Sequence, residues 1–173
     1  MEHSEQPEQA GNRLLGTLSA EDGKGVVRMQ DRFDTDIDDT WSALTDPERL
    51  ARWLGTIEGD LRVGGEYRYL FAASGAEGIG RIETCEPPRR LRVNQTAEQA
   101  EAHIIDVTLT ADGDQTILVL EERGMPAHLL AAYGAGIQVH VEDLGAHLAG
   151  RDRCDAEARW GELEPLYEEL LKD

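Results

Sequence analysis

The sequence predicts an α+β domain in which a curved antiparallel sheet wraps around one long C-terminal helix and two short helices. Two strand-like segments precede two short helical segments, and a run of about five or six strand-like segments follows. An apolar stripe with a helical period then occupies the C-terminal part of the chain. A sheet with one apolar face must be covered. The last long helix is the only expected element long enough to cover it.

The first expected strands cover residues 14–19 and 25–33 and flank the turn-forming segment 22–25. A helix is then expected to start at Asp36 or Asp38, which are good N-cap residues, with Trp41 and Leu44 on one side. A second short helix is expected over 47–54, because Asp46 suits the N-cap and Pro47 suits the first helical position.

Alternation of apolar and polar residues predicts further strands at 66–73, 78–85, 89–95, 103–110 and 116–122, with a loop over 96–99. The long helix follows. Its apolar positions step by 3, 4, 4, 3 and 4 from Leu130 to Leu148, and Gly150 is expected to end it. Gly134 and Gly136 inside it indicate a close helix–sheet contact or a kink.

Residues 156–171 form a shorter amphipathic helix that Pro165 interrupts or starts. This helix packs on the chain's own sheet or on a partner. The expected organisation is a flexible N-terminal arm over residues 1–13, one main domain over 14–150 and a helical extension over 151–173 that packs on that domain.

The composition excludes several classes of function. The chain has 173 residues, and 17 Lys and Arg against 35 Asp and Glu give a net charge of −18. Such a charge repels nucleic-acid phosphates and anionic lipid headgroups, so neither nucleic acid nor membrane is expected as a partner. With no signal-like apolar run and only Cys85 and Cys154, a cytoplasmic location is expected.

Several motifs together resemble the START-like, or SRPBCC, superfamily. Residues 33–53, with Asp38-Asp39-Thr40-Trp41 and Leu44-Thr45-Asp46-Pro47, resemble its opening signature. The segments 63–67, 86–91 and 121–124 look like the branch related to the activator of the 90-kDa heat-shock protein's ATPase. The resemblance implies a helix-grip fold with a hydrophobic cavity. It implies no ATPase, because the chain has no phosphate-cradling glycine loop.

The expected inward faces bring together a set of aromatic, apolar and polar residues that suits a small hydrophobic ligand. These candidate ligand-binding residues are Trp41, Trp53, Tyr67, Tyr69, Phe71, His103, Leu118, Leu120, Glu122, Tyr133, Ile137 and His140. The alternative is that they simply fill the core. His103 either points inward, where it could hydrogen-bond a ligand carbonyl or serve as a general base, or is a strand-edge histidine that is exposed to solvent or satisfied within the protein. Glu122 is expected to contact the C-terminal helix.

No metal or cofactor site and no catalytic set is expected. His140, Asp143 and His147 lie on the long helix, but their spacing favours a local Asp143–His147 pair over a metal site. The sequence therefore favours a non-enzymatic domain that binds a small hydrophobic molecule. Two alternatives stay open. One is a cyclase-like or hydrolase-like enzyme using His103, Glu122 or His140, and the other is an interaction module with a chaperone partner or a second copy of the chain.

Overall fold

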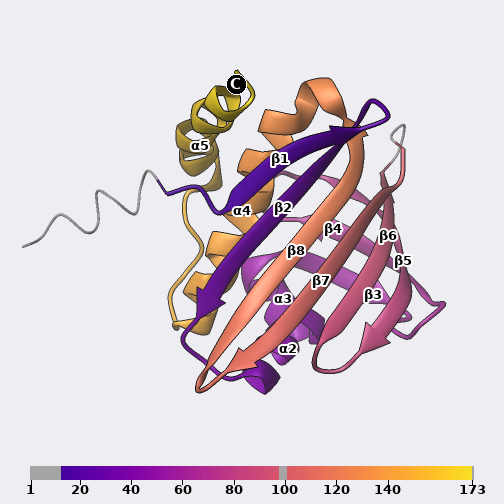
Figure 1. Cartoon of the computed structure of the whole chain (residues 1–173). Coiled ribbons are helices and arrows are strands. Elements are labelled where there is room, and N and C mark those ends of the chain that lie inside the picture. Colours follow the sequence, from indigo (N-terminus) through magenta and orange to yellow (C-terminus); the bar gives the residue numbers. More distant parts are fainter. Residues whose placement is uncertain (1–12, 98–100, 173) are drawn as a thin grey trace, which may run out of the picture.

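The computed structural model describes residues 13–97 and 101–172, and within them eight strands form one antiparallel sheet in the order β1-β2-β8-β7-β6-β5-β4-β3 (Figure 1). The strands are β1 (Gly16–Glu21), β2 (Lys24–Phe33), β3 (Gly55–Gly59), β4 (Glu66–Phe71), β5 (Glu77–Glu86), β6 (Arg90–Ala97), β7 (His103–Asp112) and β8 (Gln115–Pro126). The helices are α2 (Ile37–Thr45), α3 (Pro47–Trp53), the short 3-10 helix η1 (Ala127–Leu129), α4 (Leu130–Leu148) and α5 (Ala156–Leu170). The expected α+β helix-grip class is confirmed.

The two short helices begin where their capping residues predict. The Asp36 carboxylate accepts a hydrogen bond from the Asp39 amide at 2.8 Å, and the Asp46 carboxylate accepts one from the Glu48 amide at 3.0 Å. The Trp53 indole Nε1 donates to the Ala43 carbonyl at 2.9 Å and joins α3 to α2. The two helices are thus joined and lie together at one end of the sheet (Figure 1).

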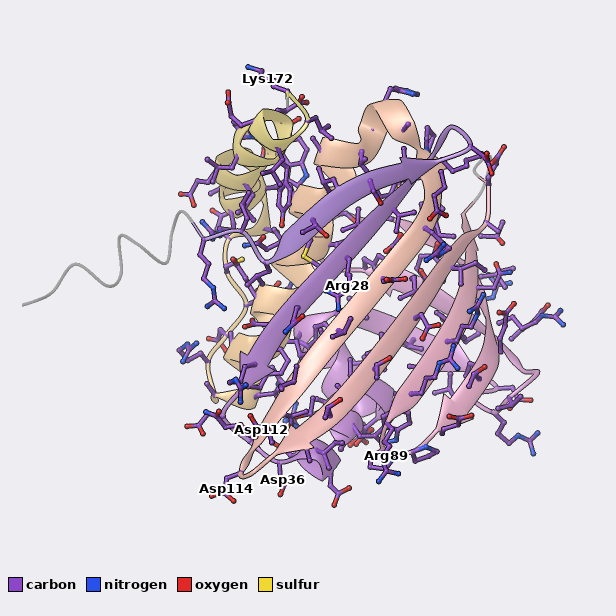
Figure 2. The ribbon with its side chains drawn as sticks, in the orientation of Figure 1. Arg28, Asp36, Arg89, Asp112, Asp114 and Lys172 are labelled. Carbon is purple, nitrogen blue, oxygen red and sulfur yellow. The ribbon has the colours of Figure 1, made fainter. Side chains whose placement is uncertain are left out.

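The outer face of the sheet carries rows of arginine–carboxylate pairs. Arg90 lies 2.8 Å from Asp106, Arg92 lies 3.1 Å from Glu83 and Arg81 lies 2.9 Å from Glu66. The Arg90 guanidinium that hydrogen-bonds to Asp106 holds the pKa of that carboxyl below its ordinary value. Charged side chains also cover the rims, including Asp112 and Asp114 at the β7–β8 turn (Figure 2). This face is therefore the solvated one.

Helix α4 crosses the inner face of the sheet, and α5 lies beside it (Figure 1). A Cβ added at Gly134 would lie 3.1 Å from a Leu18 methyl and 3.2 Å from the Tyr167 ring. The close-contact interpretation of Gly134 therefore holds, with β1 on one side and α5 on the other. Because two elements cover the helix, it buries Ala131 and Ala135 in addition to the expected stripe.

A buried polar network fixes α4 to both neighbours. The Tyr167 hydroxyl donates to the Gln138 side-chain oxygen at 2.5 Å and accepts from the Gly16 amide at 3.1 Å. The same Gln138 oxygen accepts from the Leu15 amide at 3.0 Å. Tyr167 and Leu163 are fully buried, so the apolar side of α5 packs chiefly on α4, where the expectation was the sheet.

The structure differs from the expectations at element ends. Strand β6 continues to Ala97, so the expected loop over 96–99 is wrong at its start, and 98–100 lie outside the described residues. Strand β8 runs on to Pro126 because it pairs with β2 along its length. Pro165 lies inside α5. Of the expected flexible arm over 1–13, only Arg13 is described. No helix in the described ranges combines the length and apolar character that crossing a membrane requires.

The network around Tyr167 gives a stability prediction. Tyr167→Phe removes a buried hydroxyl and leaves the Gly16 amide without its acceptor, so we expect the free energy of unfolding to fall by about 1–2 kcal/mol. Tyr133→Phe is the matched control, because no hydrogen bond of its hydroxyl is recorded among the described residues. Urea unfolding measures both, and an equal effect of the two variants would contradict a structural role for the network.

Candidate ligand pocket

A large pocket lies between α4 and the inner face of the sheet. Its volume is about 840 Å³, within the range of roughly 300–1,000 Å³ typical of small-molecule sites. Helices α2 and α3 close one end through Trp41 and Trp53, and strands β4 to β8 form the long wall. Exposed residues at its rim, including Ser74 and Glu157, show that it opens to solvent.

All the residues that the sequence proposes as ligand-binding line this one pocket. They are Trp41, Trp53, Tyr67, Tyr69, Phe71, His103, Leu118, Leu120, Glu122, Tyr133, Ile137 and His140. The alternation of β4, β7 and β8 and the helical period of α4 bring them together. Their position in the pocket does not show that they contact a ligand, so their role in ligand binding stays a prediction.

Other lining residues were not predicted from the sequence. Gln95 and Cys85 belong to β6 and β5, and Trp160 comes from α5. Gln95 shares a face with Val93, so strict alternation could have found it. Cys85 lies beyond a register shift between Ile82 and Thr84, which breaks the alternation and hides its direction.

His103 and Glu122 form the most polar feature of the pocket. The His103 Nδ1 lies 2.7 Å from a Glu122 carboxylate oxygen, and the two side chains are 13% and 14% exposed. His103 is therefore not solvent-exposed, and its contact with Glu122 fits the alternative of a strand-edge histidine that is satisfied within the protein. Glu122 contacts His103 where a contact to the C-terminal helix was expected. When Nδ1 carries the proton and donates to Glu122, Nε2 of the neutral ring is left as an acceptor.

The rings of Tyr133 and His103 meet edge to face, with centroids 5.1 Å apart. Tyr133 comes from α4 and His103 from β7, so this contact bridges helix and sheet across the pocket. Burial raises the pKa of the Tyr133 phenol, and Glu122 raises it further through charge repulsion. The phenol is therefore a neutral hydrogen-bonding group at physiological pH.

His140 lies seven residues further along α4 than Tyr133, which is about 10 Å along the helix axis. Its ring packs edge to face on Phe71 with centroids 5.1 Å apart. Burial lowers the pKa of His140 to about 4, so the imidazole is neutral. Among the described residues no hydrogen-bond partner is recorded for this ring, which leaves its nitrogen atoms to the pocket.

The aromatic residues of β4 complete the lining. Tyr69 stacks on Phe71 with centroids 4.7 Å apart, and the Tyr67 hydroxyl accepts a hydrogen bond from Gln95 at 2.9 Å. Burial raises the pKa of Tyr67 to about 12 and also raises that of Tyr69. These rings give the wall a broad apolar surface with neutral polar tips.

The expected Asp143–His147 pair does not form. The Asp143 carboxylate accepts a hydrogen bond from the Cys154 amide at 2.9 Å, while the His147 Nε2 accepts one from the Arg49 Nε at 3.1 Å. Each side chain thus contacts a segment far from its own helical turn, which local spacing does not reveal. Within residues 13–97 and 101–172, no group of three or more His, Cys, Asp or Glu side chains is placed to hold a metal ion.

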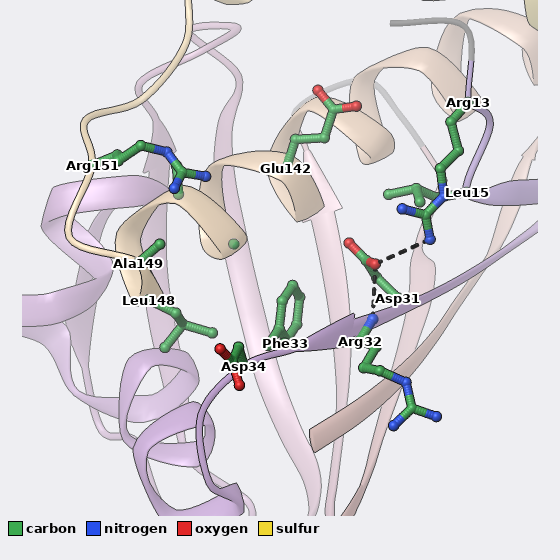
Figure 3. A pocket seen from close by; sticks show the side chains of 12 residues that line it. Arg13, Leu15, Asp31, Arg32, Phe33, Asp34, Glu142, Leu148, Ala149 and Arg151 are labelled. Atoms are coloured by element: carbon green, nitrogen blue, oxygen red, sulfur yellow. Dashed lines mark hydrogen bonds and ion pairs between the residues drawn. The ribbon is translucent and has the colours of Figure 1, made fainter. Parts of the chain in front are cut away.

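A second hollow lies on a different face of α4 and has a volume of about 420 Å³ (Figure 3). Its lining is strongly charged, and some of the charges are paired. Arg13 lies 3.6 Å from Asp31, and Arg159, which lies outside the lining, contacts Glu142 at 2.8 Å. Burial raises the pKa of the Asp31 carboxyl. Because this hollow is smaller and lacks the aromatic lining of the first pocket, it is the weaker candidate for an apolar ligand.

An antiparallel sheet that grips one long helix and leaves a lined pocket between them defines a START-like, or SRPBCC, domain. The chain belongs to the family described as "Activator of Hsp90 ATPase homolog 1-like protein", whose profile matches residues 34–149. The expected branch of the superfamily is confirmed. A comparison with curated protein sequences found no match.

Solved structures agree with this assignment. The crystal structure of CalU16 from Micromonospora echinospora matches with a TM-score of 0.75 and 27% identity, over 91% of this chain and 96% of CalU16. DynU16, a protein of the dynemicin biosynthetic locus, matches with a TM-score of 0.68 and 26% identity, over 75% of this chain and 50% of DynU16. EF2215 from Enterococcus faecalis, of unknown function, has a TM-score of 0.70 and 20% identity over 91% of this chain and 90% of its own, and shows the fold alone.

Burial of neutral His140 gives a pH prediction. Its pKa lies near 4 in the folded chain and 6.5 is its ordinary value, so between these pH values the unfolded chain binds more protons. The contribution of neutral His140 to the free energy of unfolding is then fully present above about pH 6.5 and is lost as the pH falls toward 4. As the pH falls from roughly 7 to 4.5, we expect the free energy of unfolding of His140→Phe to decrease by about 2 kcal/mol less than that of the parent chain.

The measurement is urea unfolding at several pH values. His128→Phe is the matched control, because it also replaces one histidine by phenylalanine but at an exposed position on η1. An identical pH profile for His140→Phe and the parent chain would contradict burial of a neutral imidazole.

Proposed function

We propose that this chain is a non-enzymatic binding domain that holds a small, largely apolar molecule in the pocket between the sheet and α4. The observation that carries the proposal is the pocket itself, about 840 Å³ in volume and lined mainly by aromatic and aliphatic side chains. Water makes few hydrogen bonds to such a surface. An apolar ligand that displaces this water is stabilised by the hydrophobic effect in proportion to the apolar area that it covers.

The placement of the rings suits a flat or elongated ligand. Phe71 and Tyr69 offer a stacked surface on one wall, and Tyr133 and His140 lie about 10 Å apart along α4 on the facing side. Apolar faces supply contact area, while the phenol and imidazole edges can fix a ligand's orientation through hydrogen bonds.

The solved relatives add support of a different kind. DynU16 belongs to a biosynthetic locus, and it shares 26% identity and the fold with this chain. A related domain in a biosynthetic locus is compatible with a role in binding a small molecule. The pocket, and not the relative, carries the proposal.

The His103–Glu122 pair favours a second candidate function. A carboxylate that holds the Nδ1 proton of a histidine leaves Nε2 free to accept a proton, which is the arrangement of a general base. Acting in the same pocket, the chain would then be a cyclase-like or hydrolase-like enzyme on an aromatic or polyketide-type substrate. Loss of turnover of a bound compound in His103→Ala, with its affinity unchanged, would favour this enzyme over the carrier.

The carrier proposal is tested with N-phenyl-1-naphthylamine, an uncharged apolar dye that fluoresces on burial. We expect saturable binding to the full chain at one site. Leu120→Trp adds a bulky ring inside the pocket and should weaken this binding roughly tenfold or more. Val119→Trp is the matched control, because Val119 is the neighbouring residue on β8, does not line the pocket and has its side chain on the other face.

Fluorescence titration of the parent chain and both variants gives the dissociation constants, and circular dichroism checks that the variants fold. Absence of saturable binding to the parent chain would contradict the proposal. Equal affinities of the two tryptophan variants would contradict the pocket as the site.

A further inference from the structure

Among the described residues, all the Asp, Glu, Lys and Arg side chains that line the pocket are acidic. Three carboxylate residues line it, namely Glu101, Glu122 and Glu157, and none of the Lys and Arg residues that the structure describes does so. Glu101 and Glu157 are exposed at the rim, and Glu101 forms an ion pair with Lys24, which lies outside the lining. Glu122 alone of the three is deep in the pocket, with its side chain 14% exposed.

Several uncharged polar groups also line the pocket. The hydroxyls of Tyr69 and Tyr133 and the ring of His140 line it, and within the described chain no hydrogen-bond partner is recorded for any of them. A phenol donates or accepts one hydrogen bond, and a neutral imidazole does both. Hydroxyl and carbonyl groups are the ligand atoms that match these partners without bringing a charge.

An anion would meet no lysine or arginine among the described residues that line this pocket. Burying a carboxylate, phosphate or sulfonate is costly unless a cation or several donors replace its water. Glu122 adds repulsion at short range, where the low dielectric of the apolar lining strengthens it. The contrast with the second hollow is informative, because Arg13, Arg32 and Arg151 line that hollow and the apolar pocket has no counterpart to them.

We propose that the pocket selects uncharged apolar molecules that carry hydroxyl or carbonyl groups and rejects anionic ones, such as carboxylates, phosphates and sulfonates. This inference rests on the proposed binding function and names the class of ligand for the same site. It distinguishes the chain from carriers of fatty-acid-like anions, whose sites must replace the water of a buried carboxylate with a cation or several hydrogen-bond donors.

The test compares two dyes with one scaffold. N-phenyl-1-naphthylamine is uncharged, and 8-anilino-1-naphthalenesulfonate is the same scaffold with a sulfonate group. Titration at about 0.5 M salt screens the long-range repulsion from the net charge of −18, so the remaining difference arises inside the pocket. We expect the uncharged dye to bind at least about tenfold more tightly than the sulfonate.

Glu122→Gln separates the effect of the Glu122 charge from the effect of the additional size of the sulfonate group. The amide keeps the size of the side chain and an oxygen that can accept from His103, so we expect the ratio of sulfonate affinity to uncharged-dye affinity to rise about threefold or more. Glu121→Gln is the matched control, because it changes the net charge equally but lies on the outer face, where Glu121 pairs with Arg123 at 2.8 Å.

The outcomes separate the inference from the function on which it rests. Equal affinities of the parent chain for the two dyes, or equal gains from Glu122→Gln and Glu121→Gln, would overturn charge selection and leave the binding function standing. Failure of the parent chain to bind the uncharged dye would overturn the binding function, and the inference with it.

Discussion

The contact of α4 with β1 and α5 at Gly134 is the constraint on which the rest of the structure depends. Leu18 and Tyr167 approach the position of a Gly134 Cβ to 3.1 and 3.2 Å, so a glycine lets the helix lie tightly against this edge of the sheet. The Gln138–Tyr167 network holds the same contact by hydrogen bonds. With α4 fixed at the β1–β2 side, the far strands of the curved sheet stand away from it, and the pocket lies in the space between.

The electrostatics of the pocket follow from that geometry. Two residues that face the space between sheet and helix lose water, and this shifts their pKa values toward the neutral form. Burial lowers the pKa of His140 to about 4 and raises that of Tyr67 to about 12. The His103 Nδ1 and the Glu122 carboxylate lie 2.7 Å apart in the same space. The interior therefore offers neutral hydrogen-bonding groups and one buried carboxylate, with no lysine or arginine among the lining residues in the described ranges.

Much of this site could be predicted from the sequence because it is built on periodic elements. Two-residue alternation identifies Tyr67, Tyr69 and Phe71 on β4, and the helical period identifies Tyr133 and Ile137 on α4. These patterns predict which side chains share a face, and the family resemblance implies that the two faces enclose a cavity. The order of the elements and the caps at Asp36 and Asp46 are equally local signals.

The remaining features depend on contacts between distant segments. The register shift in β5 decides where Cys85 points, and the path of the chain after α4 brings the Cys154 amide to Asp143. The expected Asp143–His147 pair failed for this reason, since helical spacing cannot show that Arg49 reaches His147. The His103–Glu122 contact likewise needs the register of β7 against β8, which alternation within one strand does not supply.

The most direct test of the account is whether the space beneath α4 is hollow. A crystal of the full chain under xenon pressure measures this, because xenon enters apolar cavities that side chains leave unfilled. The account predicts ordered xenon density between Phe71 on β4 and Ile137 on α4. Density showing Trp41, Tyr69 and Tyr133 packed together, with no room for xenon among them, would contradict it.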